Sequence, residues 1–285
     1  MKSKRSFQKP MAIVLFFLTI GSGYAQSIVI NEFMASNAGA VQSNDGQYPD
    51  WIELYNPSDQ TVSLAGLYLS DKLDNLTKWR FPDDRPDLTT LDPNGYRVVW
   101  ASGSPSTPAE LHASFSLNAD GEALVLTDTD GQTIVDVITF DKQISDTSFG
   151  RDANAPERWV FLFEPTPGQT NSAGVLGWVE PVQFSVERGF YDTPFTVTLS
   201  CPTPEVEIWY TTDAIVPHSP YAVGRDPSQV YGEIYTGPIA IAQTTCLRAV
   251  AVKEDWQEAA VITHSYLFTS DSIEQSNRPQ GFPTS

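Results

Sequence analysis

Two short apolar segments decide the fold of this chain, IVINEF at residues 28–33 and DWIELY at residues 50–55. The second segment alternates, with Ile52 and Leu54 on one face and polar or aromatic residues on the other, which is the period of a β-strand. A run of Ser, Asn, Gly and Asp separates the two segments, and Pro57 ends the second because it lacks a backbone donor. We therefore predict a pair of strands against which later strands pair or pack.

The rest of the chain shows the same strand-like pattern. Short runs rich in β-branched and aromatic residues are broken by Pro, Gly, Asn and Asp roughly every ten residues, which is typical of sandwiches and barrels. Asp130-Gly131 indicates a hairpin, because Gly accepts a positive φ without steric cost. The pattern predicts an all-β protein made of two β-sandwich domains.

The first 25 residues have the features of a secretory signal peptide. A basic start precedes an apolar run at residues 11–20, and small residues lie just before Gln26. That run is shorter than the about 20 residues that cross a bilayer. We expect cleavage of residues 1–25, no membrane insertion afterwards, and a secreted, cell-surface or periplasmic location.

The composition limits the partners. The chain has 285 residues, enough for two domains, with 17 basic and 35 acidic residues and a formal net charge of −18. Such a surface lacks the basic residues that release counterions from nucleic acid, and it is repelled by anionic lipid surfaces. We expect an extracellular protein or polysaccharide as partner, and no nucleic acid.

An ordered series of short motifs runs through the first half. It consists of Ile30-Asn31-Glu32, Asp50-Trp51-Ile52-Glu53-Leu54 with Asn56, Leu64-x-Gly66-x-x-Leu69-x-Asp71, Trp79-x-Phe81-Pro82, Leu91-x-Pro93-x-Gly95-Tyr96, Ser148-x-Gly150-Arg151 and Pro165-Thr166-Pro167-Gly168-x-x-Asn171. Taken together, the series resembles the lamin-tail domain of bacterial exported proteins. The resemblance implies an immunoglobulin-like β-sandwich over residues 26–171 that serves as an interaction module.

A second series covers residues 182–268. It consists of Phe184-Ser185-Val186, Gly189-x-Tyr191-x-x-Pro194, Ile208-Trp209-Tyr210-Thr211-Thr212-Asp213, Tyr235-Thr236-Gly237-Pro238-Ile239 and Thr244-Thr245-Cys246-Leu247-Arg248-Ala249-Val250-Ala251. It resembles the fibronectin-type-III-like C-terminal domain of chitobiases and hexosaminidases, with Ala214 where that family usually has Gly. The resemblance implies an accessory domain without hexosaminidase catalytic residues. Residues 172–181 are the predicted linker, and residues 269–285 a polar, proline-containing tail.

The order of the two modules resembles the N-terminal part of spore coat protein H-type kinase proteins. The chain itself contains neither a glycine-rich phosphate loop before a Lys strand nor a His-Arg-Asp loop. The alternative that this leaves open is an accessory part of a larger exported enzyme.

The sequence shows no assembled catalytic motif. The three histidines are widely separated, and a Gly-x-Ser-x-Gly elbow is missing. Glu32 and Glu53 can face each other across the opening strand pair, where two carboxylates could do acid–base or glycosidic work. We predict instead that they accept hydrogen bonds from a loop backbone or pair with Arg80 or Arg151, and that the chain as it stands is not an enzyme.

Two residue pairs and one aromatic group are candidate sites. Asp45 and Asp50 flank an acidic loop that could bind calcium, although the loop lacks EF-hand spacing; no other cofactor is expected. Cys201 and Cys246 permit one disulfide in an oxidising compartment. Aromatic residues that could stack on sugar rings gather around an insert at residues 217–232: Trp209, Tyr210, Tyr221, Tyr231 and Tyr235.

Trp209 and Tyr210 alternate along one strand, so at most one of the two can be available to a ligand. The function that these features favour is a non-catalytic exported binding, adhesion or targeting protein, which presents two β-sandwich modules to a protein or polysaccharide.

Overall fold

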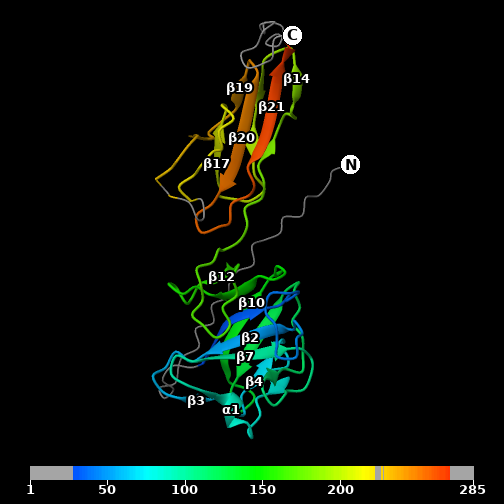
Figure 1. Cartoon of the computed structure of the whole chain (residues 1–285), viewed down its shortest axis with the longest axis vertical. Helices are drawn as coiled ribbons and strands as arrows, with labels where there is room; N and C mark the ends of the chain where they lie inside the picture. Colours follow the sequence, from blue (N-terminus) through cyan, green and yellow to red (C-terminus); the bar gives the residue numbers. More distant parts are fainter. Residues whose placement is uncertain (1–27, 222–225, 227, 270–285) are drawn as a thin grey trace, which may run out of the picture.

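The computed structural model describes residues 28–221, 226 and 228–269. The predicted signal peptide, and all but the first residue of the predicted tail, lie outside these ranges. The chain forms two β domains placed end to end and joined by one crossing segment (Figure 1). None of the helices in the described part of the chain is long and apolar enough to cross a membrane.

The first domain is a sandwich of two sheets. Its larger sheet contains, in spatial order, β12 (Trp159–Leu162), β11 (Ser148–Arg151), β1 (Val29–Met34), β2 (Asp50–Tyr55), β7 (Tyr96–Ala101) and β8 (Leu111–His112). Its smaller sheet contains β10 (Ile134–Phe140), β9 (Glu122–Thr127), β4 (Tyr68–Ser70) and β5 (Trp79–Arg80). A short pair, β3 (Val62–Ser63) and β6 (Thr90–Leu91), and the one-turn helix α1 (Pro86–Thr89) complete the domain.

The predicted opening strand pair lies at the centre of the larger sheet. Strand β1 pairs with β2 in antiparallel register, and this register places Glu32 opposite Glu53 and Phe33 opposite Ile52. The Ile52 and Leu54 face packs in the main core against residues of the smaller sheet such as Leu126. The opposite face of β2 is covered as well, because Trp51 and Glu53 are also fully buried. The alternation therefore showed which side chains share a face, and not which face is covered.

The second domain is a smaller β fold. A five-stranded sheet contains β14 (Gly189–Tyr191), β21 (Ile262–Phe268), β20 (Thr245–Val252), β17 (Glu207–Thr211) and β18 (Glu233–Ile234), in that order. Two short pairs lie beside it: β13 (Gln183–Phe184) with β16 (Leu199–Ser200), and β15 (Phe195–Val197) with β19 (Ile239–Ile241). Their apolar side chains share one core, which includes Val197, Ile239, Leu247 and the fully buried Tyr266.

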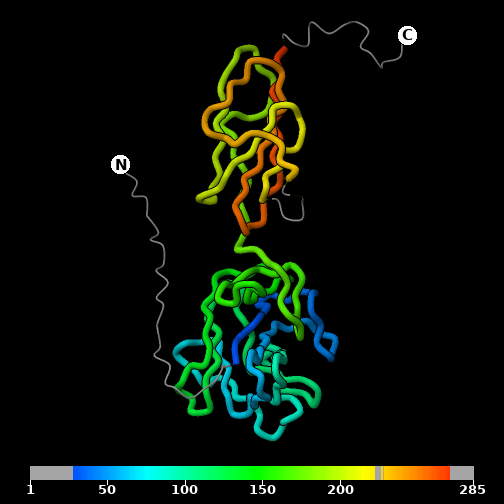
Figure 2. The backbone as a smooth tube through the Cα atoms, turned by 90° about the vertical axis from the view of Figure 1, so that its left-hand side faces the viewer, coloured from blue at the N-terminus to red at the C-terminus, as the bar shows by residue number. Residues whose placement is uncertain are grey.

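The predicted linker at residues 172–181 is paired with both domains. Val175 exchanges two backbone hydrogen bonds with Phe161 at the end of the first domain, with N–O distances of 2.8 and 3.0 Å. Val179 donates to the carbonyl of Gln257 in the second domain at 2.9 Å. Figure 2 shows this segment as the passage between the two domains. The connection is therefore held by β-type hydrogen bonds rather than running as an open chain.

Candidate functional site

The Glu32 and Glu53 carboxylates tie down the turn that begins at Pro165. Glu32 accepts hydrogen bonds from the Ser148 hydroxyl at 2.6 Å and from the Thr166 amide at 3.0 Å. Glu53 accepts from the Asn31 side-chain amide at 2.9 Å and from the Gly168 amide. Of the two roles expected for the pair, these contacts are the loop-holding one; Arg80 and Arg151 pair instead with Asp83 and Asp136.

Burial dominates the electrostatics of the two acids. Both side chains are completely buried, so a substrate has no access to them. Burial raises the pKa of Glu53 to about 8, against the lowering effect of its hydrogen bonds, and the Glu32 charge raises it further. Burial likewise raises the pKa of Glu32 above its usual value. The pair stabilises the domain and offers no exposed acid–base group.

The two aspartates proposed for calcium serve different parts of their loop. Asp45 accepts from the Ser43 hydroxyl at 2.6 Å and from the Gln47 amide at 3.0 Å, contacts that lower its pKa. Asp50 accepts from the Asn37 amide at 3.2 Å, and burial raises its pKa. Within the described ranges, no group of three or more His, Cys, Asp or Glu side chains is placed to hold a metal ion. Calcium binding stays a prediction.

A cavity of about 370 Å³ next to Asp45 contains a serine and a histidine in contact. The Ser102 hydroxyl lies 2.9 Å from Nδ1 of the buried His112, while Nε2 lies 3.8 Å from the Glu110 carboxylate. The second distance is longer than a hydrogen bond. Ser102, His112 and Glu110 therefore do not form a continuous proton relay.

The two cysteines, whose pairing the sequence left open, are free thiols in this structure. The Cys201 thiol donates to the carbonyl of Glu180 at 3.1 Å, at the edge of the core. Cys246 lies on β20 opposite Ser265 of β21, and its sulfur is 3.9 Å from that hydroxyl. The two sulfur atoms thus have separate partners, the Glu180 carbonyl and the Ser265 hydroxyl.

The five predicted aromatic residues divide into three environments. Trp209 packs against Val250 and Val252 in a buried cluster, so its ring is not accessible to a sugar. Tyr235 packs against the core and lies edge-on to Tyr210, with ring centroids 6.5 Å apart. The remaining three tyrosines line cavities: Tyr210 and Tyr231 line one, and Tyr221 lines another.

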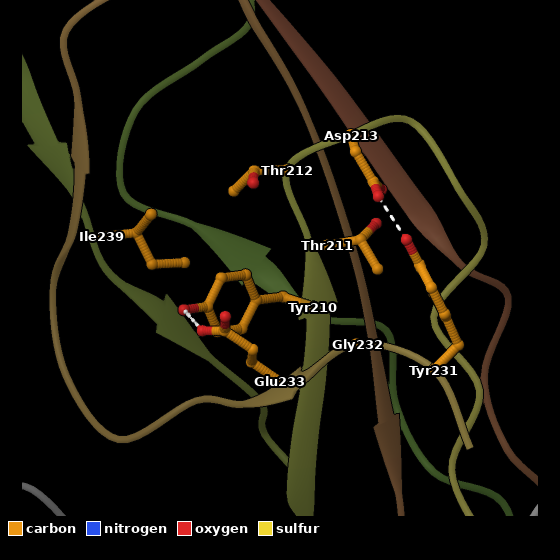
Figure 3. Close-up of a pocket in the computed structure, with 8 residues that line it drawn as sticks. All are labelled: Tyr210, Thr211, Thr212, Asp213, Tyr231, Gly232, Glu233 and Ile239. Atoms are coloured by element: carbon orange, nitrogen blue, oxygen red, sulfur yellow. Dashed lines mark hydrogen bonds between the residues drawn. The ribbon is translucent and has the colours of Figure 1, made fainter.

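The cavity that contains two of the predicted tyrosines lies beside β17 and β18 (Figure 3). We call it the β17–β18 pocket; it measures about 300 Å³ and is lined by Tyr210, Thr211, Thr212, Asp213, Tyr231, Gly232, Glu233 and Ile239. Its side chains form two phenol–carboxylate pairs. Tyr210 donates to Glu233 with an O–O distance of 2.7 Å, and Tyr231 donates to Asp213.

The two pairs shift the ionisation of their members. Burial, followed by the Glu233 carboxylate, raises the pKa of Tyr210 to about 12, so its phenol stays a donor. The hydrogen bond from Tyr231 and one from the Ile215 amide lower the pKa of Asp213. The pocket therefore presents two oriented carboxylate groups beside aromatic rings.

Two backbone positions with positive φ shape this pocket. Gly232 has φ 108°, and a Cβ there would lie 2.7 Å from the carbonyl oxygen of Tyr210, so the close approach requires glycine. Ala214 has φ 67°, which means that the turn keeps a left-handed conformation although glycine is absent.

Exposed apolar side chains gather in the insert that borders the pocket. These side chains, between 38% and 50% exposed, are Ile215, Tyr221, Val230, Tyr231 and Ile234. Sequence reasoning found the tyrosines but missed the pocket acids Asp213 and Glu233. The signal available for them was their position two or three residues from a named tyrosine.

Comparisons with known families agree with this architecture. Residues 22–142 match the Lamin Tail Domain, and residues 186–263 match the Chitobiase/beta-hexosaminidase C-terminal domain. A lamin-tail domain thus precedes a chitobiase-type C-terminal domain. This order, and the all-β fold with an immunoglobulin-like first domain, confirm the predicted families and fold class.

The lamin-tail sandwich extends beyond the matched residues. Strand β11 pairs with β1 and strand β12 pairs with β11 in the same sheet, so the structural domain reaches past residue 142. No curated protein matches the chain. The resemblance of the module order to kinase-bearing proteins stays a prediction.

Proposed function

We propose that this protein is an exported, non-catalytic module that binds polysaccharide through the β17–β18 pocket of its chitobiase-type domain. The observation that carries the proposal is the convergence of two tyrosines and two carboxylates on one cavity of about 300 Å³. A sugar ring offers C–H faces that pack on aromatic rings and hydroxyls that donate to carboxylates. The pocket contains partners for both.

The charge of the protein narrows the class of polysaccharide. The formal net charge is −18, and two of the acidic residues that contribute to it, Asp213 and Glu233, line the pocket and form no ion pair with any described residue. An anionic polymer such as a uronate or sulfated glycan would be repelled. The proposed ligand is therefore a neutral polysaccharide.

A second candidate is an accessory role in a larger exported carbohydrate-active enzyme. The match of residues 186–263 to a domain named for chitobiases and hexosaminidases favours it. The two candidates share the same binding step. The natural reading frame distinguishes them: a frame that continues after Ser285 into a catalytic domain favours the accessory role.

The binding step is tested by retention of the purified chain on insoluble cellulose, chitin and xylan. We expect retention on at least one of the three, weakened several-fold in Tyr231→Ala and Asp213→Asn. Tyr48→Ala is the matched control, because Tyr48 is 42% exposed in the first domain and Tyr231 is 40% exposed. If the wild type passes through all three matrices without delay, the proposal is wrong.

A further inference from the structure

A second cavity, of about 270 Å³, lies where the two domains meet. We call it the junction cavity; it is lined by Phe163, Ala173, Gly174, Val175, Tyr221, Glu254 and Asp255. Phe163 follows the last strand of the first domain, and residues 173–175 belong to the connecting segment. Tyr221 comes from the insert of the second domain, and Glu254 and Asp255 from the turn after β20. Both domains therefore supply its walls.

Charged and backbone contacts hold the walls of the junction cavity in place. Arg158 of the first domain pairs with Asp255 of the second at 2.5 Å and also with Asp152 of its own domain. The carbonyl of Asp255 accepts a hydrogen bond from the Leu176 amide at 2.8 Å. A Cβ at Gly174 would lie 2.5 Å from the carbonyl oxygen of Phe161, so only glycine lets the connecting segment approach this closely.

The lining combines open aromatic faces with an available acceptor. Phe163 is 45% exposed and Tyr221 is 38% exposed, one from each domain. The exposed Glu254 carboxylate makes no hydrogen bond or ion pair to another described residue, so it can accept from a ligand hydroxyl. Cavities between domains are common ligand sites because two surfaces can enclose a small molecule.

We propose that the junction cavity is a second saccharide subsite, in which Phe163 of the lamin-tail domain and Tyr221 of the second domain contact one sugar unit. The inference rests on the proposed polysaccharide-binding function and extends it to both domains. The same polymer is the expected ligand, because Tyr221 and Tyr231 belong to one insert. Backbone hydrogen bonds between His218 and Tyr231, at 2.7 and 3.0 Å, join the two parts of that insert.

Two subsites on one polymer would act together. Once one subsite is occupied, the second binds a tethered ligand at high effective concentration, so loss of either subsite weakens retention of the whole chain. Removal of one aromatic contact is expected to weaken binding roughly two- to tenfold.

The test uses the full chain and the polysaccharide on which the wild type is retained. The junction variants are Phe163→Ala and Tyr221→Ala, and the pocket variant is Tyr231→Ala. Phe190→Ala is the matched control, because Phe190 is 74% exposed on the edge strand β14 and does not line the cavity. Thermal unfolding of each variant checks that it is folded.

Weaker retention of both junction variants, with Phe190→Ala unchanged, supports the inference. Unchanged retention of the junction variants beside a weakened Tyr231→Ala overturns it and leaves the proposed function standing. Failure of the wild type to bind any matrix overturns both. Tryptophan fluorescence supplies a second measurement. The ring of Trp178 lies edge-on to Phe163, with ring centroids 5.8 Å apart, so oligosaccharides from the bound polymer should perturb its fluorescence in the wild type and in Tyr231→Ala. A response that Phe163→Ala leaves intact counts against the junction subsite.

Discussion

Raising the pH from 6 to 7.5 is expected to destabilise the lamin-tail domain through Glu53. Its pKa is about 8 in the folded domain, against an ordinary value of 4.5. Between these values the folded state keeps a proton that the unfolded state has released. The stabilisation is therefore complete below pH 4.5 and is lost as the pH rises through 8.

The size of the effect follows from one proton. A difference of one bound proton changes the free energy of unfolding by about 1.4 kcal/mol per pH unit, so the loss between pH 6 and 7.5 is about 2 kcal/mol. Glu32, whose pKa is also raised by burial, contributes in the same direction. The measurement is urea unfolding of the full chain at several pH values, followed by tryptophan fluorescence, with the transition of the first domain fitted by itself.

The variant Glu53→Gln tests how much of this pH dependence comes from the Glu53 carboxyl. Glutamine cannot accept from both the Asn31 and Gly168 donors, because its amide nitrogen is no acceptor, whereas both oxygens of the carboxyl keep acceptor lone pairs even when it is protonated. We expect a loss of about 1–3 kcal/mol at pH 6 and a flatter pH dependence. Glu157→Gln, at an exposed carboxylate of the same domain, should keep both the stability and the slope. Wild-type stability that is constant or rises from pH 6 to 7.5, or a full slope in Glu53→Gln, would refute the assignment.

Three further changes test other parts of the molecule. Asn171→Ala removes the hydrogen bonds of this buried side chain with the Asn31 amide and the Arg151 carbonyl. Chemical unfolding should show that the free energy of unfolding falls by about 2–4 kcal/mol. A fall below about 0.5 kcal/mol would contradict these contacts. Gly232→Ala forces a Cβ against a backbone carbonyl at positive φ, so polysaccharide retention should fall while the first domain melts unchanged. Alkylation of the unfolded chain without reductant should modify both cysteines, and a mass showing neither modified would establish a disulfide.

Strand positions and domain order could be predicted from the sequence. Alternation in residues 50–55 identified which side chains share a face of β2, because a strand places every second side chain on the same side, but it did not show that both faces are covered. The motif series located both domains, and the matches to 22–142 and 186–263 agree in order. The Gly and Pro content of residues 172–181 indicated a connecting segment, but it did not indicate that this segment pairs with both domains. Its partners are distant backbone groups that composition does not reveal.

The sites depended on contacts between remote residues. Alternation established that Trp209 and Tyr210 face opposite sides, but only packing of Trp209 against β20 showed which of the two is covered. The burial of Glu53 likewise depends on Gly168, 115 residues later in the chain. The sequence by itself determined that the chain is built of β-strands, since the period of a strand is local. Whether the two acids of the opening strands form an accessible site or a buried support was decided by the tertiary structure, because distant segments cover them.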